Sequence, residues 1–186
     1  MQLKTLLKVS LYENDSFDFI KAIQDHLESD DYHPYENDDF IRETIGKNIE
    51  SGDDQALIQN CYQILKKKPF DIESHVLASK AASRLNKKTL ARIHHILASR
   101  ILDIILQSGD GASYESAYRI YHPQDEMAVF NYLNKYPESR INHEKNCRFY
   151  DIYTFQDGSN LFFDVTRLFE YSINQVENGN DILKEE

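Results

Sequence analysis

The sequence predicts an α+β protein, in which an N-terminal helical layer packs on a small C-terminal antiparallel β-sheet. Three observations lead to this fold class. Apolar residues recur at helical spacing from residue 17 to residue 107. Ser108-Gly109-Asp110-Gly111 then interrupts the pattern, because glycine costs about 1 kcal/mol relative to alanine inside a helix. Two runs rich in aromatic and β-branched residues follow, over 147–155 and 160–169, and the Asp157-Gly158 dipeptide between them is a strong hairpin signal.

Five helices are expected in the first half, at 15–27, 38–51, 53–68, 71–85 and 87–107. Each begins at a residue that can cap it, or ends at a glycine, a proline or basic side chains. The third and fourth resemble a tetratricopeptide-type helix pair, in which alanines lie where the helices approach closely and a proline lies at the turn. The residues of this pattern are Ala56, Tyr62, Leu65, Pro69, Ala78, Ala82 and Ala91. Only about one such unit is found, whereas a solenoid needs three or more, so this half requires another layer to pack against.

The second half supplies that layer. A short apolar run over 117–121 and a helix over 123–136 precede the hairpin, and the chain becomes polar beyond Ser172. We expect one domain over residues 1–172, with a helical half at 1–107 and a β-rich half at 112–172. Residues 173–186 are expected to form a frayed polar tail.

Composition limits the function. The formal net charge of −10 argues against binding to anionic phosphate backbones and favours solubility or a basic protein partner. No segment approaches the roughly 20 apolar residues of a membrane span, and the apolar run at 1–9 is too interrupted for a signal peptide. A cytoplasmic protein is therefore expected, although export by another route stays open. No cofactor is expected, and Cys61 and Cys147 are expected to be free thiols.

Several short motifs carry a family resemblance. They are Tyr32-His33-Pro34-Tyr35, His75, His94, Ser108-Gly109-Asp110-Gly111, Ser113, Glu115, Ala117, Tyr118, Asp125-Glu126, Tyr150-Asp151 and Leu161-Phe162-Phe163. On these motifs the segment from Tyr32 to Phe169 resembles an uncharacterised bacterial family, domain of unknown function 4919. The resemblance implies a fold and a set of positions, and it brings no activity with it.

The candidate site centres on His75 and His94, which lie on apolar helix faces. If the fourth and fifth helices form a hairpin that turns at Asn86-Lys87, Ser79 lies opposite His94 and His75 lies about 6 Å further along. Imidazoles in a packed seam need hydrogen-bond partners. The polar groups expected to supply them are Tyr32, Tyr35, Asp110 and Glu115.

Two interpretations of this constellation stay open. The two histidines form an acid–base or metal pair oriented by Asp110, or they are satisfied core residues that join the two halves. Histidines at close helical spacing, typical of metal sites, are missing. No catalytic residue is assigned, because Ser113 has no base near it in sequence. Asp125-Glu126 is expected to cap a helix rather than to act on a substrate.

The function predicted from these patterns is a non-enzymatic acidic protein-binding module. A concrete version is a bacterial immunity or inhibitor protein that neutralises a basic toxin or effector through charge complementarity. The alternative is a small-ligand-binding protein or hydrolase-type enzyme with a pocket formed by His75, His94 and Asp110. Asp30-Asp31 and Asp38-Asp39 flank the tyrosine–proline segment, and this acidic, aromatic patch is a solvated loop or a partner surface.

Overall fold

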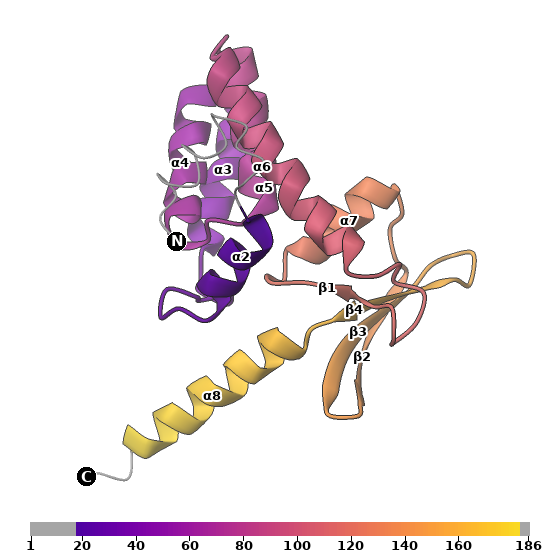
Figure 1. Ribbon diagram of the computed structural model, residues 1–186. Coiled ribbons are helices and arrows are strands. Elements are labelled where there is room, and N and C mark those ends of the chain that lie inside the picture. The colour runs from indigo at the N-terminus through magenta and orange to yellow at the C-terminus, as the bar shows by residue number, and fades with distance from the viewer. Residues whose placement is uncertain (1–17, 183–186) are drawn as a thin grey trace. The chain divides into compact units, whose positions relative to one another are not determined.

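The computed structural model describes residues 18–182 and the side chains of residues 18–174. The chain divides into two compact units, one up to Ile104 and one from Ile105 onward, and each is described by itself. The predicted α+β class is confirmed: helices make up the described part of the first unit, and a four-stranded sheet lies in the second (Figure 1). That residues 1–172 form one domain stays a prediction.

The helices of the first unit are α2 (Phe19–Leu27), α3 (Asp39–Ser51), α4 (Asp54–Lys67), α5 (Ile72–Arg84) and α6 (Lys88–Gln107), whose last three residues belong to the second unit. The last four helices match the predicted spans, because their boundary signals are local. Asp53 accepts a hydrogen bond from the Ala56 amide, and Asp71 accepts one from the Ser74 amide. Gly52, at a φ of 71°, ends α3 in the left-handed conformation. The cap predicted at Asp15-Ser16 lies outside the described residues, and Asp18 caps α2.

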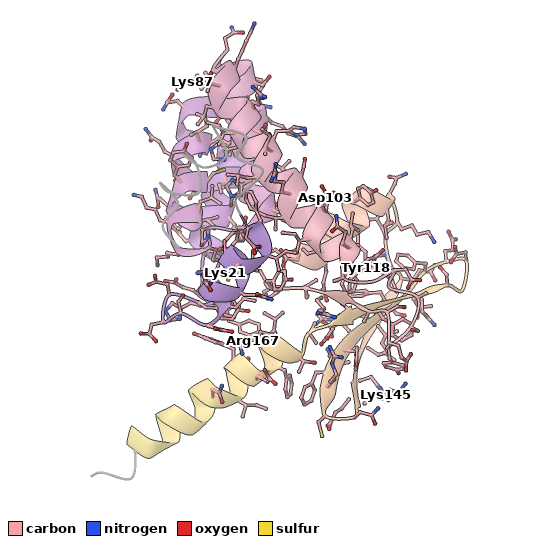
Figure 2. All side chains as sticks on the ribbon, in the orientation of Figure 1. Lys21, Lys87, Asp103, Tyr118, Lys145 and Arg167 are labelled. Atoms are coloured by element: carbon pink, nitrogen blue, oxygen red, sulfur yellow. The ribbon has the colours of Figure 1, made fainter. Side chains whose placement is uncertain are left out.

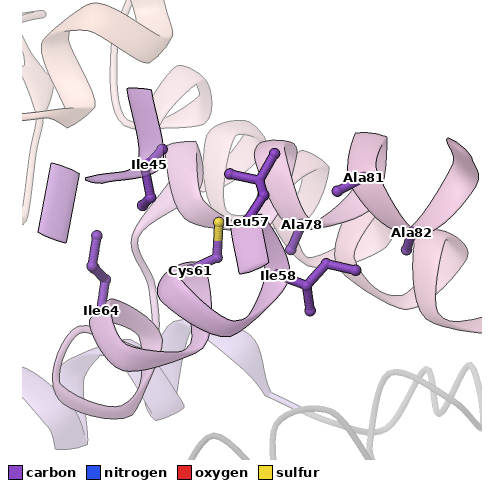
Figure 3. Packing of buried hydrophobic residues seen from close by; sticks show 8 residues of the cluster. All are labelled: Ile45, Leu57, Ile58, Cys61, Ile64, Ala78, Ala81 and Ala82. Carbon is purple, nitrogen blue, oxygen red and sulfur yellow. The ribbon is translucent and has the colours of Figure 1, made fainter. Parts of the chain in front are cut away.

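The apolar core of the first unit lies between α3, α4 and α5 (Figure 3). Its residues are Ile45 from α3, Leu57, Ile58, Cys61 and Ile64 from α4, and Ala78, Ala81 and Ala82 from α5. The three alanines have no side chain beyond Cβ, so α5 can approach α4 closely; the sequence pattern names Ala78 and Ala82 for this contact. Burial of this apolar surface stabilises the pair by roughly 25 cal/mol per Å² removed from water.

The second unit contains β1 (Tyr118–Arg119), α7 (Asp125–Leu133), β2 (Ser139–Lys145), β3 (Arg148–Thr154), β4 (Asn160–Asp164) and α8 (Thr166–Ile182). The strand order is β1-β4-β3-β2. β3 and β4 form the predicted antiparallel hairpin and β2 adds a further antiparallel strand, but β1 runs parallel to β4, with Tyr118 opposite Phe163. The sheet is therefore mixed, because the long connection through α7, β2 and β3 brings the chain back in the same direction.

Two features of the second half differ from what the sequence predicts. The hairpin at Asp157-Gly158 is confirmed, but the strand predicted over 160–169 ends at Asp164. The Asp164 carboxylate accepts a hydrogen bond from the Thr166 amide at 3.1 Å and starts α8 there. α8 runs to Ile182, and the fraying expected of residues 173–186 stays a prediction. β2 was not predicted at all, because six of its seven residues are exposed and no polar–apolar alternation marks it. Over residues 18–182, no helix has the length and apolar character needed to cross a bilayer.

Candidate functional site

His75 and His94 meet directly inside the first unit. The His75 Nδ1 and His94 Nδ1 atoms are 2.8 Å apart, and both side chains are fully buried. His75 Nε2 lies 3.0 Å from the carbonyl oxygen of Pro69, in the α4–α5 connection. His94 Nε2 lies 3.1 Å from the hydroxyl of Tyr62 on α4. One hydrogen-bonded chain thus connects α4, α5, α6 and the loop at Pro69.

The direction of every bond in this chain follows from the carbonyl at its end. A carbonyl only accepts, so His75 Nε2 carries a hydrogen, and in a neutral ring His75 Nδ1 is then an acceptor. His94 Nδ1 must therefore donate to His75, which leaves His94 Nε2 to accept from the Tyr62 hydroxyl. All four ring nitrogens are satisfied while both rings stay uncharged.

Burial keeps the two rings neutral. It lowers the pKa of His75 to about 4, although the Pro69 carbonyl and Asp71 act in the opposite direction. Burial, followed by repulsion from His75, lowers the pKa of His94 to about 3. If both rings were protonated, two N–H groups would face each other across the 2.8 Å contact. Neither imidazole has a free lone pair for a metal ion or a substrate, so this geometry is that of a structural network.

The partners of these histidines differ from those expected. Ser79 does lie near α6, where its hydroxyl donates to the Ala91 carbonyl at 2.8 Å. The imidazole of His75 nevertheless reaches His94 from one turn further along α5. The hydroxyl partner is Tyr62, not Tyr32 or Tyr35. The sequence analysis named Tyr62 only as part of the helix-pair pattern. That pattern does not show that α4 lies close enough to α6 for Tyr62 to reach His94.

Tyr32 and Tyr35 lie elsewhere in the first unit. Tyr32 is buried and packs edge-on against His26 of α2, with ring centroids 5.9 Å apart. Burial also lowers the pKa of His26 to about 4. The sequence analysis did not select His26, although its position on the buried face of α2 is a signal that helical spacing could have given. The side chain of Tyr35 is 51% exposed.

Asp110 and Glu115 belong to the second unit, where the Ser108–Gly111 segment organises a loop. The Asp110 carboxylate accepts from the Ala112 amide at 2.9 Å and from the Ser116 hydroxyl. These hydrogen bonds lower its pKa. Glu115 is exposed and pairs with Lys145 at 3.0 Å. Both carboxylates therefore act within the second unit, one as a turn residue and one in a surface ion pair.

A second polar cluster, missed in the sequence, joins α7 to the sheet. The Tyr153 hydroxyl donates to the Glu126 carboxyl, and Arg140 and Asn142 of β2 donate to the Asp151 carboxylate. Burial, followed by the hydrogen bond to Asp151, raises the pKa of Glu126 to about 8, which favours the protonated form of this carboxyl. Residues two apart on a strand share a face, which is the signal that could have linked Asp151 with Tyr153.

The two neighbouring acids Asp125 and Glu126 lie in the first turn of α7, as predicted, but the N-cap residue is Gln124, which makes no side-chain capping bond. Asp125 accepts from the amides of Tyr121 and His122, both at 2.9 Å, and closes the turn before the helix. Glu126 points instead to Tyr153. Because Glu126 and Asp151 are 7% and 2% exposed, the pair is a buried acid within the α7–sheet contact rather than an open catalytic dyad.

An acidic, aromatic surface lies on the segment from Glu28 to Phe40, named here the acidic loop surface. Its exposed acids are Glu28, Asp30, Asp31 and Asp39. Phe40, in the first turn of α3, is 80% exposed. Asp38 is not part of this surface, because it pairs with Arg42 at 3.0 Å and with the buried Lys68 at 3.3 Å.

The side chains that could hold a metal ion are scattered. Among the described residues, no three histidine, cysteine, aspartate or glutamate side chains are grouped as a metal site would require. Both cysteines are free thiols: Cys61 is buried, which raises its pKa to about 12, and Cys147 is exposed.

Comparison with known proteins gives one match. A family model described as "Domain of unknown function (DUF4919)" matches residues 6–173. Neither the curated proteins nor the solved structures include a significant match.

Proposed function

Because this chain belongs to the DUF4919 family, whose description assigns no activity, we propose its function from its own surfaces and buried groups. It is a non-enzymatic, acidic protein-binding module, and its partner is a protein with a basic surface. The proposal rests mainly on the acidic loop surface, a segment that carries four exposed carboxylates and two exposed aromatic rings.

The composition of this surface is typical of a protein interface. Exposed aromatic side chains are enriched at interface centres, where one or two of them supply most of the binding energy. Tyr35 and Phe40, 51% and 80% exposed, are suited to this role. The carboxylates of Asp30, Asp31 and Asp39 would form a charged rim that steers a basic partner and raises its association rate.

The net charge of −10 gives the molecule a negative electrostatic potential, which also attracts a basic partner. Its concrete form is a bacterial immunity or inhibitor protein that acts in the cytoplasm and masks a basic toxin or effector. Such a protein needs no cofactor and no catalytic residue. It needs a stable scaffold and a charged surface that is complementary to its target.

The alternative, a pocket that uses His75, His94 and Asp110, has less support. A ligand pocket requires polar groups that a ligand can reach. The imidazoles of His75 and His94 are fully buried, and their four nitrogens are occupied by each other, by Tyr62 and by Pro69. This occupancy is why the binding module is preferred.

The proposal is tested by affinity capture over a series of salt concentrations. Beads with the unmodified protein are compared with beads carrying Phe40→Ala, and with beads carrying Asp30→Asn together with Asp31→Asn. We expect Phe40→Ala to weaken capture of the specific partner by about tenfold or more, as for an interface hot spot. The double substitution should reduce the dependence of capture on salt, because fewer charges are involved.

Matched controls separate this surface from general acidity. Tyr132→Ala removes another aromatic ring, 62% exposed, from the second unit. Glu50→Gln with Glu138→Gln removes two exposed charges elsewhere. Both controls should capture the partner as the unmodified protein does. The proposal would be contradicted by a partner whose capture does not change with ionic strength. It would also be contradicted if the control substitutions weakened capture as much as the substitutions in the acidic loop surface.

A further inference from the structure

The free edge of the sheet in the second unit carries a second interaction surface. We infer that two copies of this chain associate through β2, which pairs antiparallel with itself about a two-fold axis at Asn142. The four-stranded sheets of the two copies then form one continuous sheet. This self-association is separate from the binding of a basic partner through the acidic loop surface.

β2 is a long and open edge. It has seven residues and, among residues 18–182, pairs only with β3, whereas the opposite edge strand, β1, has two residues. Natural edge strands are commonly protected by proline, bulges, charged side chains or shortness, and of these β2 has only charged side chains. β2 contains no proline, and its register with β3 is continuous from Ser139 to Lys145.

The hairpin turn decides which backbone groups of β2 face outward. Asn146 and Cys147 have φ values of 55° and 59°, as in a type I′ turn, so the flanking Lys145 and Arg148 form a hydrogen-bonded pair. Bonded pairs alternate along an antiparallel ladder. Ser139, Ile141, His143 and Lys145 therefore direct their N–H and C=O groups to β3. Arg140, Asn142 and Glu144 direct theirs to the free edge.

Bonds on the other side of β3 agree with this assignment. The Val165 amide donates to the Phe149 carbonyl at 2.9 Å, so Phe149 faces the side of β4. By alternation, the next residue, Tyr150, faces β2, where its opposite residue is His143. The Glu138 amide donates to the Thr154 carbonyl at 2.9 Å, which places Thr154 on the β2 side as well.

The three outward residues are complementary to themselves in one register. With the axis at Asn142, this residue faces its own copy, and Arg140 faces Glu144 of the second copy on both sides of the axis. Opposite charges placed directly across a strand pair stabilise it, and like charges destabilise it. A shift of the axis to Arg140 or to Glu144 places two identical charges opposite each other. Charge complementarity thus selects a second copy of β2, in one register, as the occupant.

The side chains between these positions also gain a partner. Ile141 is an aliphatic residue whose side chain is 57% exposed. In the register centred on Asn142, Ile141 lies opposite His143 of the second copy, in a pair without backbone bonds, where side chains are closest. The imidazole of His143 is held in place by the Tyr114 hydroxyl, 3.1 Å from its Nδ1. Pairing therefore covers an exposed aliphatic side chain with a fixed ring.

Cysteine cross-linking tests the register. Cys147 is exposed and is first replaced by Cys147→Asn, because asparagine tolerates a positive φ. In that background Asn142→Cys brings two thiols together across the axis, with Cα atoms about 5.5 Å apart, within the disulfide range. Glu144→Cys is the matched control, since its two copies would be about 13 Å apart. We expect rapid oxidative dimerisation of the first variant and little of the second.

Sedimentation velocity over a range of protein concentrations tests the backbone pairing. Glu144→Pro removes two outward N–H groups from the dimer without removing a bond to β3, so it should weaken dimerisation by about tenfold or more. Glu144→Gln keeps the N–H and should have a smaller effect. Circular dichroism confirms that each variant is folded. A monomer at all concentrations, equal cross-linking of the two cysteine variants, or a dimer unaffected by Glu144→Pro would overturn the inference.

Discussion

At the scale of single residues, the chain formed by Tyr62, His94, His75 and the Pro69 carbonyl explains how two imidazoles are buried without charge. A buried polar atom that lacks its partner costs about 1–3 kcal/mol. Here each nitrogen has one partner, and the carbonyl at the inner end fixes the tautomer of both rings. The network therefore stabilises a particular packing of α4, α5 and α6.

The outer end of this chain gives a direct prediction. Tyr62→Phe keeps the ring but removes the hydroxyl that donates to His94, so a fully buried nitrogen loses its donor. We expect the free energy of unfolding to fall by about 1–3 kcal/mol, as measured by urea denaturation followed by circular dichroism. Tyr114→Phe is the matched control, because it removes a tyrosine–histidine bond of the same 3.1 Å length at an exposed site. There we expect a change below about 0.5 kcal/mol, and equal losses in the two variants would contradict a special role for the buried chain.

At the scale of elements, the Ser108–Gly111 segment connects three parts of the second unit. The Ser108 hydroxyl accepts from the Arg119 amide of β1 at 2.8 Å, and the Gly111 carbonyl accepts from the Phe162 amide of β4 at 2.9 Å. Gly109 is closely enclosed: a Cβ at that position would lie 2.0 Å from the Ser116 carbonyl oxygen. The segment thus ends α6 and also positions the strands.

Crowding at Gly109 predicts a large effect for a small substitution. Gly109→Ala requires the backbone at Ser116 to move, and we expect the second unit to lose about 3 kcal/mol of stability. Gly46→Ala is the matched control within α3, since a Cβ there meets nothing within 4 Å. It should raise stability by about 0.5–1 kcal/mol, because alanine favours helix. Thermal denaturation of both variants measures the difference, and similar shifts would show that the loop tolerates movement.

The elements also show what the sequence can and cannot predict. The spans of α3 to α6 were predictable because Asp53, Asp71 and Gly52 act on the backbone within one turn. β2 was not, since its residues are exposed on both faces and no apolar periodicity results. The end of β4 was hidden because aromatic residues continue past Asp164 into α8.

The same distinction applies to the candidate site. Helical spacing placed His75 and His94 on one seam, and this could be read from the sequence. Their partner Tyr62 depends on how closely α4 approaches α6, which is a property of packing. The Glu126–Tyr153 bond likewise requires the position of α7 on the sheet. Long-range contacts of this kind leave no local signal.

At the scale of the whole molecule, folding shifts proton binding in opposite directions in the two units. The first unit buries groups that favour the deprotonated form, and the second buries a group that favours the protonated form. In the first unit His75 and His94 are buried uncharged, with pKa values of about 4 and 3 in place of 6.5. In the second unit burial raises the pKa of Glu126 from 4.5 to about 8. Stability follows the difference in protons bound by the unfolded and folded states. The units should therefore respond to pH in opposite directions.

The pKa shifts decide whether each unit loses stability as the pH falls or as it rises. Hydrogen exchange, measured for separate peptides, gives the stability of each unit separately. Below pH 6.5 unfolded histidines bind protons that His75 and His94 do not, so the first unit should lose roughly 2 kcal/mol per histidine between about pH 7.5 and pH 5. Between pH 4.5 and 8 folded Glu126 holds a proton that the unfolded chain releases, so the second unit should lose stability as pH rises through this window. Glu126→Gln keeps a neutral side chain at every pH. It should abolish the loss of stability of the second unit with rising pH, while the first unit still loses stability on acidification. If Glu126→Gln instead changed how much stability the first unit loses on acidification, the assignment of the two pH responses to separate units would be wrong.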